Sequence, residues 1–347
     1  MKPGKPVIRE EDMGGKATGN AGKARAGGRP TEAAGRGSRL CRVERMANPA
    51  VPPAPPDIPG AEQRTVTIDA HDVGALGVHL HEAGDGPPVL LLHGWPQDAL
   101  CWRHVMPLLA DRHRVIAPDL RGFGASDAPG RGYNGETFGA DAIALLDALE
   151  IERAHLIGHD WGGFATFAAA VAAPQRIASM VVLNTIPPWV EVTPRKALEL
   201  WRSLYAVPLA AFGDRIVRSR PDVIARMLRA DRVHDGISRA DAEGYAARLQ
   251  RPESARATAL LYRSYLRSFR VVAVERRYAN LRLTVPTRFL FGTNDMAVSH
   301  RLLDGLERHC DDLTVELVED SGHFIQEERP ELVAERAAEL FALHPAA

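Results

Sequence analysis

The fold is decided by an apolar run that ends in a glycine-flanked aspartate, Ala154-His155-Leu156-Ile157-Gly158-His159-Asp160-Trp161-Gly162-Gly163, and by the alanine-rich residues 164–172 that follow it. This pattern predicts a buried strand that turns sharply into a helix. The glycines leave room for a strained turn, so the Asp160 side chain projects at the edge of the sheet. The backbone N–H groups at the start of the helix then lie beside it and can stabilise negative charge. An aspartate in a tight turn is usually only a turn residue, but this setting favours a nucleophile.

On both sides of this stretch, short runs of aliphatic and β-branched residues alternate with amphipathic segments. Such alternation is typical of a mostly parallel sheet covered by helices, so we expect an α/β fold. The expected strands are residues 65–69, 77–82, 89–93, 114–118, 154–158, 180–183, 287–292 and 314–318.

Residues 187–283 interrupt this alternation and are predicted to be successive helices. The expected helix starts are marked by Pro194, Pro221, Pro252 and Ser238. We expect these helices to form an inserted cap over the carboxyl ends of the strands, where such sheets bind ligands. The core is then made of residues 61–186 and 284–347.

The first 60 residues differ in composition from the rest of the chain. Residues 1–46 contain 11 Lys and Arg against 5 Asp and Glu, with few large apolar side chains, so they cannot build a hydrophobic core. Residues 49–60 are rich in proline and predict an extended linker. We therefore expect residues 1–60 to be a disordered basic extension followed by a linker, with a transit peptide or a polyanion-binding arm as alternatives.

The overall composition excludes several classes of protein. The chain has 347 residues, 43 Lys and Arg against 44 Asp and Glu, and 45% hydrophobic residues, a balance typical of a globular protein with no nucleic-acid partner. Its apolar stretches fall far short of the roughly 20 residues that cross a bilayer, so no membrane partner is expected. Cys41, Cys101 and Cys310 form no Cys-x-x-Cys pair, which favours a cytoplasmic location. Neither a metal nor any other cofactor is expected, since the usual motifs are missing.

Four motifs occur in a fixed order along the chain. They are His93-Gly94-Trp95-Pro96, Asp119-Leu120-Arg121-Gly122-Phe123-Gly124-Ala125-Ser126, the turn at residues 158–163, and Gly292-Thr293-Asn294-Asp295 with Gly322-His323. Together they resemble the α/β-hydrolase superfamily, in the branch that holds epoxide hydrolases and haloalkane or haloacetate dehalogenases. The resemblance covers roughly residues 61–345. It implies an α/β-hydrolase fold with a mostly parallel eight-stranded sheet flanked by helices and an inserted helical cap.

The resemblance also implies a catalytic triad. Asp160 is the expected nucleophile, His323 the general base and Asp295 the acid that holds the imidazole, with Asp320 as the weaker rival of Asp295. An aspartate suits attack on a saturated carbon, because the resulting ester can be hydrolysed, whereas attack by serine would leave an ether. The histidine is then needed only to activate water in the second step.

Four further residues are assigned around this triad. The backbone N–H groups of Trp95 and Trp161 are expected to form the oxyanion hole. His93 and Trp189 are assigned to the substrate pocket, although for the His93 imidazole we favour a buried group that shapes its loop. Several other histidines are expected on solvated or helix surfaces: His79, His81, His113 and His309.

Epoxide opening needs acidic donors opposite the nucleophile, and similar epoxide hydrolases supply cap tyrosines. The segment at residues 260–265 resembles the region of the second tyrosine and indicates Tyr262, whose helical spacing places it on an apolar face. A core tyrosine would show the same pattern. Tyr205 is the candidate for the first tyrosine, but the register could put Arg202 in its place, and Tyr245 is a more remote alternative.

These expectations favour an enzyme that hydrolyses an epoxide to a vicinal diol through an ester on Asp160. The alternative is a haloalkane or haloacetate dehalogenase with the same triad, in which the Trp161 indole would donate to the halide. Against it, Trp95 stands where haloalkane dehalogenases usually carry a polar residue, and Trp161 replaces the arginine of fluoroacetate dehalogenases. A non-catalytic ligand-binding protein is a third alternative. The expected partners are a small, mainly apolar substrate and water, and a homodimer is left open.

Overall fold

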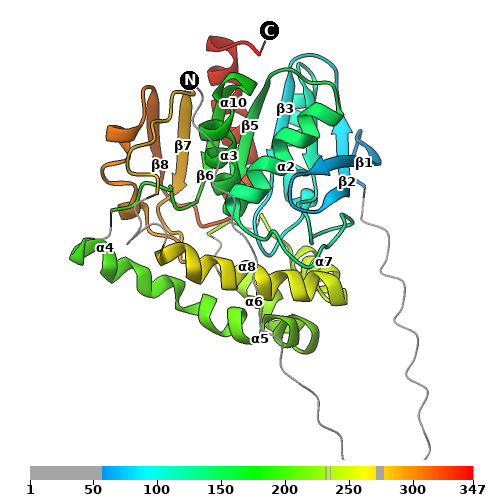
Figure 1. Cartoon of the computed structure of the whole chain (residues 1–347), viewed down its shortest axis with the longest axis vertical. Helices are drawn as coiled ribbons and strands as arrows, with labels where there is room; N and C mark the ends of the chain where they lie inside the picture. Colours follow the sequence, from blue (N-terminus) through cyan, green and yellow to red (C-terminus); the bar gives the residue numbers. More distant parts are fainter. Residues whose placement is uncertain (1–56, 192, 231–232, 235, 271–276, 347) are drawn as a thin grey trace, which may run out of the picture. The chain divides into compact units, whose positions relative to one another are not determined.

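Eight strands form the central sheet in the computed structural model, which describes residues 57–191, 193–230, 233–234, 236–270 and 277–346 (Figure 1). The strands are β1 (Glu62–Ala70), β2 (Gly74–Ala83), β3 (Pro88–Leu92), β4 (Arg114–Pro118), β5 (Ala154–His159), β6 (Ile177–Leu183), β7 (Thr287–Gly292) and β8 (Leu313–Val318). Each lies where the alternating pattern predicts a strand, and the expected α/β fold is confirmed. The predictions for residues 1–56 lie outside the described residues.

The strand order is β1-β2-β4-β3-β5-β6-β7-β8. The β1–β2 and β2–β4 pairs are antiparallel, and all other pairs are parallel. The central strands β5 and β6 are buried along their whole length, as expected for parallel strands covered on both faces. Leu92 lies opposite Gly158, and His159 lies opposite Leu183. The carboxyl ends of β3, β5 and β6 therefore meet at one edge of the sheet.

The core helices flank this sheet (Figure 1). They are α1 (Met106–Ala110), α2 (Gly135–Ala148), α3 (Trp161–Ala172), α9 (Ile325–Glu328) and α10 (Pro330–Leu343), with 3₁₀ turns η1 (Ala99–Trp102), η2 (Pro174–Arg176), η5 (His300–Leu303) and η6 (Leu306–His309). Helix α3 packs on β3, β5 and β6, and α10 packs on β6 and β7. Because a single residue, Asp160, separates the end of β5 from the start of α3, the chain makes there the sharp turn that the sequence predicts.

An inserted helical region lies between β6 and β7. It contains α4 (Pro194–Glu199), η3 (Leu200–Tyr205), α5 (Ala206–Ser219), α6 (Pro221–Ala230), α7 (Arg239–Leu249) and α8 (Pro252–Arg270). Figure 1 shows these helices gathered beyond one end of the strands. Helix α5 packs along α8, and Gly213 permits the close approach, since a Cβ there would lie 3.2 Å from Cα of Ala259. Ser238 and Asp241 form a capping box at the start of α7.

Over the described residues, no helix has the length and hydropathy to cross a bilayer.

Two histidines of β2 are buried, so the expectation that they lie on a solvated surface was wrong. The Nδ1 atom of His79 lies 3.0 Å from Oδ2 of Asp119. The Asp119 carboxylate also accepts from the backbone N–H of Ala99 at Oδ1 and from that of Ala125 at Oδ2. Burial lowers the pKa of His81. The reason is that β2 pairs with a strand on each side and its middle residues are covered on both faces. An alternating sequence did not reveal this, because it is typical of a half-exposed strand.

Candidate active site

Asp160 lies at the sharp turn between β5 and α3, with φ 52° and ψ −116°. A non-glycine residue in such a conformation stores about 1–3 kcal/mol of strain, which the surrounding packing must support. Gly162 makes the turn possible, because a Cβ there would collide with the carbonyl oxygen of Leu92. A Cβ at Gly94 would collide with the Asp160 side chain itself. The fold therefore holds this carboxylate tightly against the loop that follows β3.

Two backbone N–H groups donate to the Asp160 carboxylate. That of Trp95 donates to Oδ1 at 3.0 Å, and that of Trp161 also donates to the carboxylate. Burial raises the pKa of Asp160 to about 6, while His323 and the two N–H groups oppose the rise. The carboxyl is therefore mostly ionised at neutral pH, with one oxygen fixed by donors.

The imidazole of His323, in the loop after β8, lies between two carboxylates. Its Nδ1 contacts Oδ2 of Asp295 at 2.9 Å, and its Nε2 lies 3.7 Å from Oδ2 of Asp160. The Asp295 carboxylate favours the proton on Nδ1, which directs the Nε2 lone pair toward Asp160. A separation of 3.7 Å is too long for a direct hydrogen bond. This geometry suits an imidazole that acts on a water molecule near Asp160.

Asp295 follows β7 and is nearly fully buried. Its Oδ1 accepts hydrogen bonds from the backbone N–H groups of Ala297 and Val298 at 2.7 and 2.8 Å. The side-chain amide of Asn184 donates to Oδ2 at 2.8 Å, and this contact was missed from the sequence. The only signal was a polar residue placed directly after the apolar strand β6. The rival Asp320 is exposed, and Asp295 is the carboxylate that holds His323.

A pocket opens on Asp160 between the sheet edge and the inserted helices. The space that it encloses, open solvent included, is about 920 Å³. Its wall is mainly apolar and carries a few polar groups. The lining residues are Gly135, Asp160, Trp161, Phe164, Thr185, Ile186, Pro187, Val190, Tyr205, Tyr262, Tyr265, Ser268, Ala297 and Val298.

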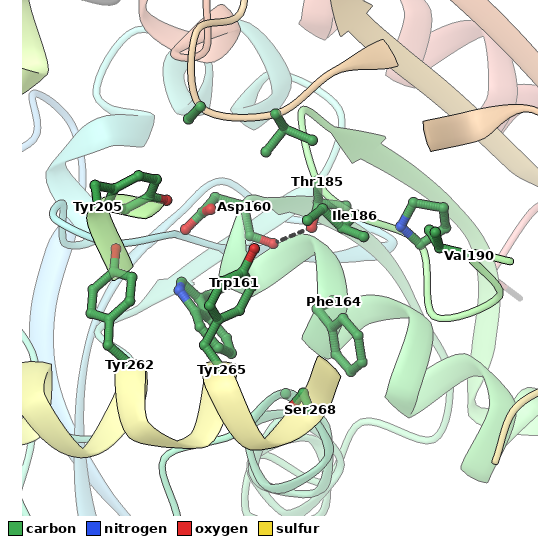
Figure 2. A pocket seen from close by; sticks show the side chains of 14 residues that line it. Asp160, Trp161, Phe164, Thr185, Ile186, Val190, Tyr205, Tyr262, Tyr265 and Ser268 are labelled. Atoms are coloured by element: carbon green, nitrogen blue, oxygen red, sulfur yellow. Dashed lines mark hydrogen bonds between the residues drawn. The ribbon is translucent and has the colours of Figure 1, made fainter. Parts of the chain in front are cut away.

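Three tyrosines of the inserted region lie around this carboxylate. Figure 2 shows Tyr262 and Tyr265 rising from α8 toward Asp160, with Tyr205 close to the same carboxylate. The rings of Tyr205 and Tyr262 lie 5.8 Å apart, centroid to centroid, in an edge-on arrangement. Burial raises the pKa of both hydroxyls, so both carry their protons at neutral pH. The arrangement places neutral O–H donors opposite an ionised carboxylate.

The family model of the alpha/beta hydrolase fold matches residues 87–330 of this chain. The chain belongs to the α/β hydrolase fold family. Its relatives in this family include epoxide hydrolases and dehalogenases at about 30% identity.

Three relatives illustrate this. The chain is 29% identical to the soluble epoxide hydrolase of Corynebacterium sp. (strain C12), over 79% of this chain and 98% of that protein. It is 34% identical to a fluoroacetate dehalogenase of Burkholderia sp., over 47% of this chain and 55% of that protein. The solved structure of the epoxide hydrolase CorEH without ligand has a TM-score of 0.65 at 26% identity, over 82% of this chain and 99% of that one.

In this α/β hydrolase, two residues predicted to touch the substrate lie outside the pocket lining. His93 is buried: its Nδ1 donates to the carbonyl of Gly94 at 3.0 Å, and its Nε2 accepts from the N–H of Leu120 at 2.9 Å. Both ring nitrogens are thus used to shape the loop. Trp189 donates its indole N–H to the carbonyl of Leu281 at 3.0 Å and stacks on His309. Their assignment to the substrate pocket is therefore corrected.

The two rival candidates for the first cap donor also lie elsewhere. Arg202 is not among the residues that line the pocket and donates to the backbone carbonyl of Asp295 at 2.5 Å. Tyr245 is buried in a separate polar cluster, where it donates to Glu327 at 2.8 Å and accepts from Arg103 at 2.9 Å. Of the three candidates, Tyr205 is the one that lines the pocket.

Tyr265 is a pocket residue that the sequence reasoning did not single out. It follows Tyr262 by three positions on α8, and this spacing was the available signal, since such residues share a helix face. Its ring lies 5.8 Å from the Trp161 ring, centroid to centroid.

Among the residues that the structure describes, no three His, Cys, Asp or Glu side chains are grouped so as to hold a metal ion.

Proposed function

We propose that this α/β hydrolase opens epoxides to vicinal diols through a covalent ester on Asp160. The observation that carries the proposal is the pair of neutral tyrosine hydroxyls facing an ionised carboxylate in a mainly apolar pocket. An epoxide needs a nucleophile at carbon and an acid at oxygen at the same moment. Asp160 supplies the first, and Tyr205 and Tyr262 supply the second.

In the first step, Oδ2 of Asp160 attacks one epoxide carbon and the bond from that carbon to the ring oxygen breaks. Oδ1 is held by the N–H of Trp95, so it becomes the carbonyl oxygen of the ester. The ring oxygen takes a proton from Tyr262 or Tyr205, which leaves a tyrosinate at that residue. This donation is worth most as the C–O bond breaks, because the charge develops then.

In the second step, His323 takes a proton from water and hydroxide adds to the ester carbonyl. The N–H groups of Trp95 and Trp161 stabilise the tetrahedral oxyanion. Collapse expels the diol oxygen, which receives the proton held by His323. The Asp160 carboxylic acid then loses its proton, which restores the tyrosine. Asp295 holds the imidazole and stabilises its charge throughout.

Removing either pocket hydroxyl is expected to slow ring opening. Tyr262→Phe and Tyr205→Phe should each lower the rate of ester formation about 10²-fold, since a positioned general acid contributes about 10²–10⁴-fold. Stopped-flow tryptophan fluorescence in a single turnover of one terminal epoxide measures this rate. Tyr133→Phe is the matched control, because its hydroxyl donates to the carbonyl of Pro129 outside the pocket. Unchanged rates in both pocket variants would contradict the assigned donors.

Ester formation is expected to slow in acid with a midpoint near pH 6. Burial raises the pKa of Asp160 to about 6, and a protonated carboxyl does not attack carbon. The rate should therefore fall about tenfold for each pH unit below the midpoint and be level above it. The same single-turnover measurement, made from about pH 5 to about pH 8, tests this. A midpoint near the ordinary aspartate pKa of about 4 would contradict the burial effect.

A dehalogenase with the same triad is the second candidate. Trp161 favours it, because this aromatic residue lines the pocket directly beside Asp160. The indole N–H of Trp95 disfavours it, since it donates to Thr258 at 3.1 Å and is not directed at a halide. Halide release from haloalkanes or fluoroacetate, faster than diol formation from any epoxide, would favour this candidate.

We also propose a reducing, cytoplasmic setting for the enzyme, with a small apolar epoxide and water as its partners. Cys101 and Cys310 are buried free thiols in the described part of the chain, which is consistent with that setting.

A further inference from the structure

A second polar feature lies in the pocket beside the ring-opening tyrosines. The hydroxyls of Ser203, on η3, and Tyr265, on α8, are 2.7 Å apart. Ser203 is buried, and Tyr265 lines the pocket. The neighbouring wall is apolar and includes Phe164 and Val190. Two hydroxyls in such surroundings are costly unless hydrogen-bonded, and their mutual bond offsets that cost.

This pair is separate from the groups proposed to open the epoxide. The ring of Tyr262 packs edge-on against that of Tyr205, whereas the hydroxyl of Tyr265 is bonded to Ser203. The rings of Tyr262 and Tyr265 lie 6.3 Å apart, centroid to centroid, and both rise from α8 toward Asp160 (Figure 2). A substrate whose oxirane lies at Tyr262 therefore extends past Tyr265.

The pair can serve a ligand as donor or as acceptor. Either hydroxyl can donate in the Ser203–Tyr265 bond, and each oxygen also has two lone pairs. A substrate oxygen that reaches Tyr265 would meet a hydroxyl already oriented by Ser203, so little side-chain entropy is lost on binding. A methylene at the same place would desolvate the hydroxyl without a new hydrogen bond.

Resting on the proposed function, we infer that Tyr265, oriented by Ser203, is a specificity residue that selects epoxides with a second oxygen a few bonds from the oxirane. The chemical class is that of glycidyl ethers and epoxy alcohols. The two oxygens of these compounds are three bonds apart, at most about 4 Å. Tyrosines whose rings lie 6.3 Å apart can both reach such a pair, because each O–H···O bond spans about 2.7 Å.

The test compares glycidyl methyl ether with terminal epoxypentane, which differ only by an ether oxygen in place of a methylene. The wild type is expected to prefer the ether in kcat/KM. Tyr265→Phe should reduce that preference about five- to tenfold, the value of one neutral hydrogen bond, because kcat/KM for the ether falls more than kcat/KM for epoxypentane. Ser203→Ala should reduce the preference in the same direction and serves as the second variant if Tyr265→Phe folds poorly. Tyr133→Phe is the control.

Three results would overturn the inference. One is a wild type without preference for the ether. Another is a preference that survives both variants, and a third is an equal fall with both substrates, which a merely structural Ser203–Tyr265 contact would produce. If the wild type turns over neither epoxide but does release halide, the proposed function itself fails, which is a different and recognisable result.

Discussion

Replacing His323 by glutamine is expected to stop the enzyme after its first chemical step, with the protein heavier by one whole epoxide molecule. Glutamine cannot take the proton of the attacking water, whereas ester formation needs only the Asp160 carboxylate and the tyrosine donors. Hydrolysis of the ester should therefore slow by about 10³-fold or more, the loss typical of a catalytic histidine. The intact mass of His323→Gln, incubated in turn with a terminal epoxide and with a haloalkane, measures this.

The form of the adduct also decides the chemistry. A protein that gains the whole epoxide supports ring opening, while one that gains an alkyl group without its halogen supports the dehalogenase. His104→Gln is the matched control, because His104 is exposed on the core surface, and it should turn over substrate without retaining an adduct. If the wild type turns over epoxides and His323→Gln retains nothing, covalent catalysis is refuted.

Asp160→Asn is expected to abolish turnover, with a loss of at least about 10⁴-fold, in the range found when a nucleophile is removed. Asparagine is the most conservative choice, since it tolerates the positive φ of this turn and keeps an oxygen acceptor for the N–H of Trp95. Its amide oxygen carries no charge and is a poor nucleophile, so the first step fails.

The double variant Asp160→Asn/His323→Gln locates the ester. It should retain no adduct under conditions where His323→Gln alone is fully modified. The His323→Gln substitution is kept in the double variant because a water activated by His323 could otherwise hydrolyse the asparagine amide back to a carboxylate. Asp320→Asn is the control, because Asp320 is an exposed aspartate that also has a positive φ. An adduct of equal yield in the double variant would place the nucleophile elsewhere.

Much of the candidate site could be predicted because its parts follow strands. Asp160 comes after β5 and Asp295 after β7, while His323 follows β8. Parallel strands bring their carboxyl ends to one edge of a sheet, so residues far apart in sequence converge there without any knowledge of side-chain packing. The family resemblance indicated Trp95, which follows β3 and whose N–H lies 3.0 Å from Oδ1 of Asp160.

The failures concern residues whose side-chain direction depends on packing. His93 and Trp189 were assigned to the pocket, but their ring nitrogens are bonded to backbone groups. Asn184 was not singled out, because a lone asparagine after a strand has no pattern that indicates a buried carboxylate at 2.8 Å. The pairing of Ser203 with Tyr265 joins two segments of the inserted region that share no periodicity.

The sequence by itself therefore determined the alternating α/β architecture and the strained turn at Asp160, because these depend on local periodicity and glycine sterics. The resemblance of its motifs to the α/β-hydrolase superfamily supplied the expected triad and its order along the chain. The sequence indicated Tyr262 and Tyr205, but only the tertiary structure placed Tyr265 beside them and showed which polar groups are bonded elsewhere. The inserted helices are positioned by packing against one another and against the core. Their rotation about their own axes, which decides the side chains that enter the pocket, is not encoded in any local pattern.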